Sequence, residues 1–231
     1  MITPDGWLDW ADRAPGPDDK VYAAPNAAQG YVAHSAVGYR PGALERLMSD
    51  ERRPDGRYTA YAAASWHLWV GYDGNVLQHY PFFSSCWHAG AAFPNCSFIG
   101  AETEGGADPY SEPLTGPQLD QHARIIRELA TFFTWPEIRR PADANDRFAQ
   151  LYEHNECVRW GAAPTACPSG RIPWDRLLER LDGPMTQPAV PTPRDIAYAG
   201  AAAALFAQEG RSLTDLHTYD QETLRWLARQ L

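Results

Sequence analysis

The stretch WHLWVGYDGNVLQHY, residues 66–80, decides the first element of the fold. Residues 66–70 and 76–80 are two β-prone runs, and Asp73-Gly74 lies between them. An Asp-Gly pair between two such runs is a strong signal for a β-hairpin, because glycine readily adopts the positive φ that a tight turn needs. The stretch therefore predicts two neighbouring antiparallel strands.

The segments on either side place this hairpin in a larger sheet. Further strands are expected at residues 30–33, 97–103 and 151–154, the last followed by a long loop to Cys167. Helices are expected at residues 42–48, from residue 116 onward, and at residues 173–181. Residues 1–29 are rich in Pro and Gly and are expected to be irregular. Strands and helices in this order predict an α/β domain with a central mixed β-sheet flanked by helices.

The 231-residue chain is expected to divide into three parts. Residues 1–183 form the domain described above. Residues 184–194 carry four prolines and predict a stiff linker. Residues 195–231 are expected to form a short C-terminal helical tail, which is too short to hold a core of its own. We therefore expect the tail to pack on the main domain or to mediate self-association.

Composition excludes several classes of protein. A formal net charge of −9 argues against a general nucleic-acid binder, whose surface would be basic. No run approaches the ~20 apolar residues of a membrane span, so no membrane insertion is expected. The N-terminus, MITPDGWLDWADR, lacks the basic and apolar segments of an ordinary signal peptide. Four cysteines are too few for a disulfide scaffold in a chain of this length.

Two histidines and one cysteine suggest a metal site. His34 and His154 each end a predicted strand, and Cys167 lies in a loop rich in turn-forming residues. Taken singly, each has a structural interpretation, because many histidines are hydrogen-bonded in cores and a free cysteine usually behaves as a small buried hydrophobe. Together they form a His₂Cys set, and three protein ligands with one open position are typical of catalytic Zn²⁺.

A carboxylate is expected near this set. Glu102 lies within a hydrophobic strand, where a charged side chain needs a partner or a function. Glu104 shares its face of the strand, and one of the two is expected to face solvent. Beside a metal-bound water, such a carboxylate is the natural general base. Of the remaining histidines, His79 is expected on the surface of the hairpin and His122 on the polar side of its helix.

Five blocks of sequence resemble a known family. They are Val32-Ala33-His34-Ser35-Ala36, residues 66–70 with Asp73-Gly74, residues 86–90, residues 97–102 and residues 165–170. In this order they resemble the zinc-dependent N-acetylmuramoyl-L-alanine amidases of the amidase-2 and peptidoglycan-recognition-protein superfamily, over roughly residues 28–182. The resemblance implies hydrolysis of the amide between N-acetylmuramic acid and L-alanine in bacterial peptidoglycan.

The resemblance also implies a role for each matching residue. It makes His34, His154 and Cys167 the ligands of one Zn²⁺ per chain, Glu102 the carboxylate that activates the zinc-bound water, and Thr165 a donor to the developing oxyanion. The residues implied at the substrate groove are His88, Trp87, Trp66 and His67. His67 is expected to support the residues that line the site. Trp66 stands where several relatives carry a catalytic Tyr, so Glu102 is expected to carry the catalytic role instead.

Several alternatives stay open at this stage. The interval from His154 to Cys167 is longer than the family pattern, so Cys157 is a second choice of thiolate. Cys86 and Cys96 either form a disulfide or stay reduced, and reduced thiols are favoured. The implied role is that of a phage or prophage endolysin, made in the cytoplasm and released through a holin-type pore.

Three other functions compete with the endolysin interpretation. They are a cytoplasmic anhydromuropeptide-recycling amidase, a non-catalytic peptidoglycan-binding protein of the same fold, and a protein whose zinc is purely structural. Binders of this fold typically lose the metal cysteine, so Cys167 argues against the second. A structural zinc would need a fourth ligand such as Cys157.

Overall fold

The computed structural model describes residues 1–106 and 112–182. Its main sheet has the strand order β1–β5–β4–β7–β3–β8. These strands are β1 (Asp12–Arg13), β3 (Gly30–Ser35), β4 (Leu68–Val70), β5 (Val76–Gln78), β7 (Phe98–Thr103) and β8 (Leu151–Glu153). A small second sheet pairs β2 (Val21–Tyr22) with β6 (Ser85–Cys86). The helices are α1 (Arg40–Met48), α2 (Ala92–Ser97), α3 (Gly116–Phe132), the 3₁₀ helix η1 (His154–Trp160) and α4 (Trp174–Asp182).

The main sheet is mixed, as predicted. Strands β4, β7, β3 and β8 run parallel to one another, whereas β5 is antiparallel to β4. The predicted hairpin is the β4–β5 pair, and Gly74 in its turn has a φ of 82°. Because β3, β7 and β8 are parallel, their carboxyl ends meet at one edge of the sheet, where ligand sites of such sheets usually form.

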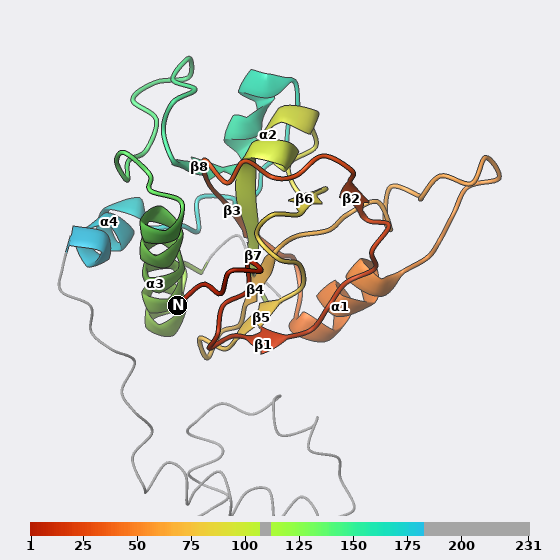
Figure 1. Ribbon diagram of the computed structural model, residues 1–231, viewed down its shortest axis with the longest axis horizontal. Helices are drawn as coiled ribbons and strands as arrows, with labels where there is room; N and C mark the ends of the chain where they lie inside the picture. Colours follow the sequence, from red (N-terminus) through yellow and green to blue (C-terminus); the bar gives the residue numbers. More distant parts are fainter. Residues whose placement is uncertain (107–111, 183–231) are drawn as a thin grey trace, which may run out of the picture. The chain divides into compact units, whose positions relative to one another are not determined.

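One face of the sheet carries the larger core. Helix α3 begins with a capping box in which the Thr115 hydroxyl accepts the Gln118 N–H and the Gln118 side chain accepts the Thr115 N–H. Its apolar stripe, with Leu119 and Ile126, packs against the sheet residues of this core, and α4 packs against α3. Figure 1 shows α3 and α4 together on this side of the sheet and α1 on the other.

The opposite face carries a smaller core and the predicted site residues. Side chains alternate along a strand, so Val32 and His34 of β3 share this face with Phe98, Gly100 and Glu102 of β7. Val32 and Phe98 pack there in a cluster with other buried residues. The polar residues of this face follow directly after the apolar ones, at the carboxyl ends of the strands.

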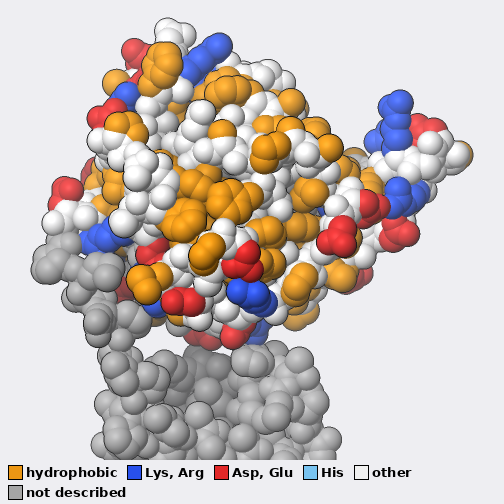
Figure 2. Space-filling view, viewed as in Figure 1, with side chains coloured by type: hydrophobic (Ala, Val, Ile, Leu, Met, Phe, Trp, Pro, Cys, Tyr) orange, Lys and Arg blue, Asp and Glu red, His pale blue; other side chains and the backbone are white. Residues whose placement is uncertain are grey.

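A projecting arm, residues 49–61, follows α1 (Figures 1 and 2). Figure 2 shows side chains of both charges at its tip. Arg52 forms ion pairs with Asp50 at 2.8 Å and with Asp19 at 2.7 Å, which tie the arm to itself and to the N-terminal segment. The chain then returns to the domain and brings Ala63 and Ala64 to the wall of the cavity described below.

Several predictions need correction or lie outside the described residues. Residues 154–160 form a 3₁₀ helix rather than the start of a loop, and residues 1–29 contain β1 and β2. His79 and His122 are buried rather than exposed, because His79 donates to the Ala14 carbonyl and His122 bonds to hydroxyls of the sheet. The predicted linker and tail, residues 184–231, lie outside the described residues. Within the described part, no helix is long and apolar enough to cross a membrane.

Candidate active site

The carboxyl ends of three parallel strands bring the predicted metal ligands together. His34 lies near the end of β3, directly opposite Glu102 of β7 in the strand register, and His154 follows the last residue of β8. Cys167 comes from the loop before α4. The ligand atoms of His34, His154 and Cys167 all lie within 4.8 Å of one another. Among the described residues, this is the one group of three or more His, Cys, Asp or Glu side chains that can hold a metal ion.

The positions of these three side chains, and the neutral state of the two histidines, fit a divalent cation such as Zn²⁺. Nδ1 of His34 lies 3.9 Å from Sγ of Cys167, and the rings of His34 and His154 are 4.6 Å apart. Burial lowers the pKa of His34 well below its usual value and that of His154 to about 4, so both imidazoles are neutral, as metal ligands must be. Burial raises the pKa of the Cys167 thiol, and a bound cation would favour its thiolate form. Two imidazoles and a thiolate are a donor set that suits Zn²⁺.

Hydrogen bonds hold the Cys167 loop against β3 and η1. The Ser35 N–H donates to Sγ of Cys167 at 3.2 Å, and the Asn155 N–H donates to the Cys167 carbonyl at 2.9 Å. The Thr165 hydroxyl accepts the Cys167 N–H at 3.2 Å, so Thr165 both shapes the loop and lines the cavity. The Cys167 loop is therefore bonded to the segments that carry the other two ligands, at Ser35 and at Asn155.

Glu102 and Glu104 have different environments. Glu102 is 18% exposed, with Oε1 at 3.9 Å from Nδ1 of His34 and Oε2 buried without a hydrogen-bond partner. Burial raises its pKa to about 7. Glu104 instead accepts the N–H groups of Arg40 and Tyr72, each at 3.0 Å, and so joins α1 to the hairpin. A buried carboxylate with an unpaired oxygen beside the ligand set is suited to proton transfer, whereas Glu104 is a structural residue.

A cavity of about 490 Å³ opens over these residues. Its wall includes Trp66, Trp69 and Trp87, and Glu102 and Arg46 are its two charged residues besides the ligand set. Sequence reasoning did not single out Trp69 or Arg46. Trp69 lies beside Glu102 in the β4–β7 register, and the hairpin prediction contained the signal for it. Arg46 comes from α1, whose position over the groove is a property of the tertiary structure.

His88 lines this cavity and His67 does not, and the ring nitrogens of both are hydrogen-bonded within the protein. His88 is 7% exposed and lines the wall, but Nδ1 bonds to His34 at 3.1 Å and Nε2 to the Phe98 carbonyl at 3.2 Å. His67 is fully buried, donates from Nε2 to the Ser84 carbonyl and accepts the Gly100 N–H at Nδ1. Neither ring has a nitrogen left for substrate. Their expected role at the substrate groove stays a prediction, and His88 could contact a substrate only through the carbon atoms of its ring.

The other cysteines lie apart from the ligand group. Cys157 is fully buried in the smaller apolar core and its Sγ donates to the Glu153 carbonyl at 3.8 Å. It is absent from the group of potential metal ligands, which removes the reason for holding it as a fourth or alternative ligand. Cys86 and Cys96 are both free thiols.

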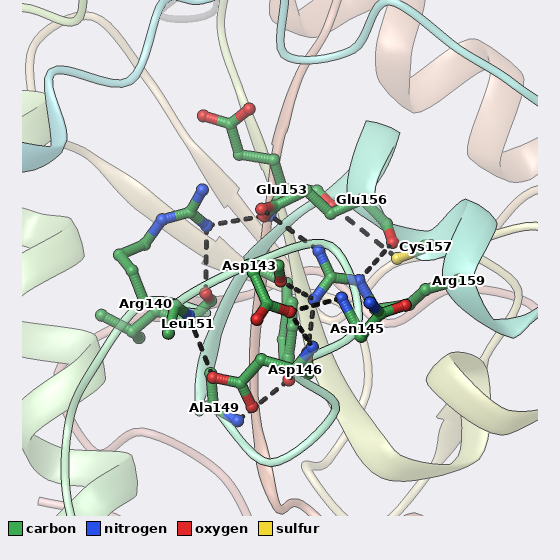
Figure 3. Close-up of polar contacts among 12 residues, drawn as sticks. Arg140, Asp143, Asn145, Asp146, Ala149, Leu151, Glu153, Glu156, Cys157 and Arg159 are labelled. Atoms are coloured by element: carbon green, nitrogen blue, oxygen red, sulfur yellow. Dashed lines mark hydrogen bonds and ion pairs between the residues drawn. The ribbon is translucent and has the colours of Figure 1, made fainter.

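An ionic network supports the helix that begins at His154 (Figure 3). The Glu156 carboxylate accepts the Glu153 N–H and a guanidinium N–H of Arg140, both at 2.7 Å. Arg140 also donates to the Leu151 carbonyl at 3.0 Å and so reaches back to β8. Figure 3 shows these side chains converging at the junction between β8 and η1. These contacts therefore hold the backbone turn that positions His154.

Two imidazoles, a thiol and a buried carboxylate at the base of an aromatic groove are typical of metal-dependent hydrolases. The chain matches the amidase_2 family, described as N-acetylmuramoyl-L-alanine amidase, over residues 24–170 and belongs to that family. The match spans all the predicted site residues. A comparison with curated proteins found no match.

Solved structures share the fold. The chain is similar to a selenomethionine derivative of AmpD, with 22% identity and a TM-score of 0.54 over 78% of this chain and 99% of that one. It is similar to the endolysin amidase LysCS from Clostridium intestinale, with 15% identity and a TM-score of 0.51 over 78% and 99%. It is also similar to the Staphylococcus aureus hydrolase AmiA in complex with its ligand, with 15% identity and a TM-score of 0.53 over 76% and 83%. These likenesses confirm the predicted α/β fold.

Proposed function

We propose that this chain is a zinc-dependent amidase that hydrolyses the bond between N-acetylmuramic acid and L-alanine in peptidoglycan. The observation that carries the proposal is the His34–His154–Cys167 group with the unpaired Oε2 of Glu102 beside it. The family to which the chain belongs supports this reaction and substrate. His34, His154 and Cys167 would hold the ion, which when bound polarises the scissile carbonyl and acidifies a water.

The chain's own residues would complete the reaction. Glu102 would accept the proton of the attacking water and return it to the leaving amine, a role suited to a carboxyl group whose pKa burial raises to about 7. The Thr165 hydroxyl accepts the Cys167 N–H, and its own proton would donate to the oxyanion. Trp66 and Trp87 would contact the sugar or the peptide from the wall of the groove. Since Trp66 has no hydroxyl, a mechanism that depends on Tyr at this position is not open to this chain.

Metal analysis combined with mass spectrometry of the products tests this proposal. We expect one Zn²⁺ per chain and release of intact stem peptides with a free L-alanine amino group from purified peptidoglycan. Cleavage within the glycan or within the peptide would contradict the assignment. Full activity after exhaustive chelation would contradict zinc dependence.

We further propose an endolysin role, in which the substrate is the assembled cell wall. The endolysin LysCS shares the fold, which is compatible with this role. Clearing of a cell-wall suspension is the expected result. Cleavage of soluble anhydromuropeptides without clearing would instead indicate a recycling amidase.

A further inference from the structure

We propose that His88 is a positioning residue that fixes the tautomer of the metal ligand His34 through a hydrogen bond anchored on the Phe98 carbonyl. This inference rests on the proposed zinc site and assigns His88 a role other than contact with substrate. It starts from two consecutive hydrogen bonds that link four atoms: the Phe98 carbonyl oxygen, Nε2 and Nδ1 of His88, and Nε2 of His34.

The backbone carbonyl determines where the protons lie. A carbonyl oxygen can only accept, so Nε2 of His88, 3.2 Å from the Phe98 oxygen, must carry a proton. His88 is buried beside His34 and His67, and its ring bonds to an imidazole and a carbonyl rather than to a carboxylate, so nothing in direct contact within the described structure compensates a positive charge and the ring is neutral. Nδ1 of neutral His88 is therefore an acceptor, and Nε2 of His34, 3.1 Å away, must donate to it.

The consequence reaches the metal site. With its proton on Nε2, neutral His34 has its lone pair on Nδ1, the nitrogen that lies 3.9 Å from Sγ of Cys167. The opposite tautomer would place a proton between His34 and the other ligands. A hydrogen bond to the outer nitrogen of a ligating histidine also fixes the ring orientation and raises its basicity. His88 thus prepares His34 to bind a cation before any cation arrives.

The sequence around His88 provides the space and the support that this arrangement needs. The N–H groups of His88 and Ala89 both donate to Oδ1 of Asn95, at 3.0 and 2.7 Å, which fixes the backbone of the histidine. Gly100 of β7 lies under the ring, and a Cβ there would come within 2.4 Å of Cγ of His88. Only glycine at this position lets the ring lie between Phe98 and His34.

Zinc affinity of three variants tests the proposal, measured by competition with a chromogenic chelator. His88→Leu removes the acceptor, and we expect the zinc dissociation constant to rise about 10- to 100-fold. His88→Asn keeps an oxygen near the position of Nδ1 and should recover most of that loss. His122→Leu is the matched control, because His122 is also buried and bonded through both nitrogens but lies on the opposite face of the sheet. It should bind zinc with unchanged affinity.

A folded His88→Leu protein with unchanged zinc affinity would overturn the proposal, as would an equal loss in the His122→Leu control. If His88→Leu does not fold, ¹⁵N NMR of the unsubstituted, metal-free protein decides. We expect the His34 proton on Nε2 with Nδ1 unprotonated, and the reverse would overturn the proposal. A protein with this tautomer that binds no zinc would refute the proposed function and leave the tautomer assignment standing.

Discussion

Lowering the pH from 7.5 to 5.0 should destabilise this protein through its buried neutral histidines, and His122 permits a quantitative test. Its Nδ1 lies 2.6 Å from the Tyr31 hydroxyl and its Nε2 2.9 Å from the Thr103 hydroxyl. Burial, with a further contribution from the charge of Arg171, lowers its pKa from 6.5 to about 4. Within the described structure, both ring nitrogens bond to hydroxyl groups and neither bonds to a carboxylate that would stabilise the charged ring.

The sign and size of the effect follow from proton linkage. The unfolded chain binds a proton at this histidine below about pH 6.5, whereas the folded chain binds it only below about pH 4. Between these pH values the unfolded state holds more protons, so the free energy of unfolding decreases as the pH falls. At about 1.4 kcal/mol per pKa unit, His122 alone should remove about 2 kcal/mol between pH 7.5 and 5.0.

Urea unfolding at both pH values measures this contribution. His122→Gln retains hydrogen-bonding groups but does not titrate, so its free energy of unfolding should fall by about 2 kcal/mol less than that of the unsubstituted protein. The metal site is the same in both proteins, and its own pH dependence cancels in the difference. His79, whose pKa burial also lowers to about 4, should give a similar and additive result on substitution. Equal losses of stability in the variant and the unsubstituted protein would refute the reasoning.

Three further predictions concern the site. Cys167→Ser should lose zinc, measured by metal analysis, and with it hydrolysis; a variant that kept stoichiometric zinc would contradict the ligand assignment. Glu102→Gln should retain zinc while kcat falls on the order of 10²–10⁴-fold, whereas Glu104→Gln should mainly reduce stability; equal losses of kcat would contradict the choice of base. Arg46→Gln should raise KM about five-fold for muropeptides with free carboxylates, because a partly exposed ion pair contributes ~1 kcal/mol to binding. The rise should be smaller for amidated muropeptides. An equal rise for both substrates would argue against recognition of charge by Arg46.

The strands and the positions of His34 and His154 could be predicted from the sequence because their signals are local. The Asp73-Gly74 turn predicted the hairpin, and His34 and His154 each follow an apolar run whose end fixes their place at the sheet edge. His122 shows the opposite case. It lies three residues after Leu119 and four before Ile126, on the buried stripe of α3, but its polarity suggested an exposed position. Helical spacing was the better guide there.

Other parts of the site depend on contacts between segments distant in the chain. Arg46 reaches the groove through the placement of α1, which no periodicity predicts. The hydrogen bonds of His88 depend on the Phe98 carbonyl, and backbone groups carry no identity in the sequence. The 3₁₀ helix at His154 depends on Glu156 and Arg140, whose pairing is visible only in the folded chain.

The ligands also stand far apart along the chain, since 133 residues separate His34 from Cys167. An ion held by both would act as a cross-link that closes a loop of this length. In the chain-entropy account, closing such a loop removes about 5 kcal/mol of freedom from the denatured chain, comparable to a long-range disulfide. A metal placed for chemistry would thus also fasten the first long strand to the last loop of the domain. Chelation would then open the polypeptide to proteases as well as stop the reaction.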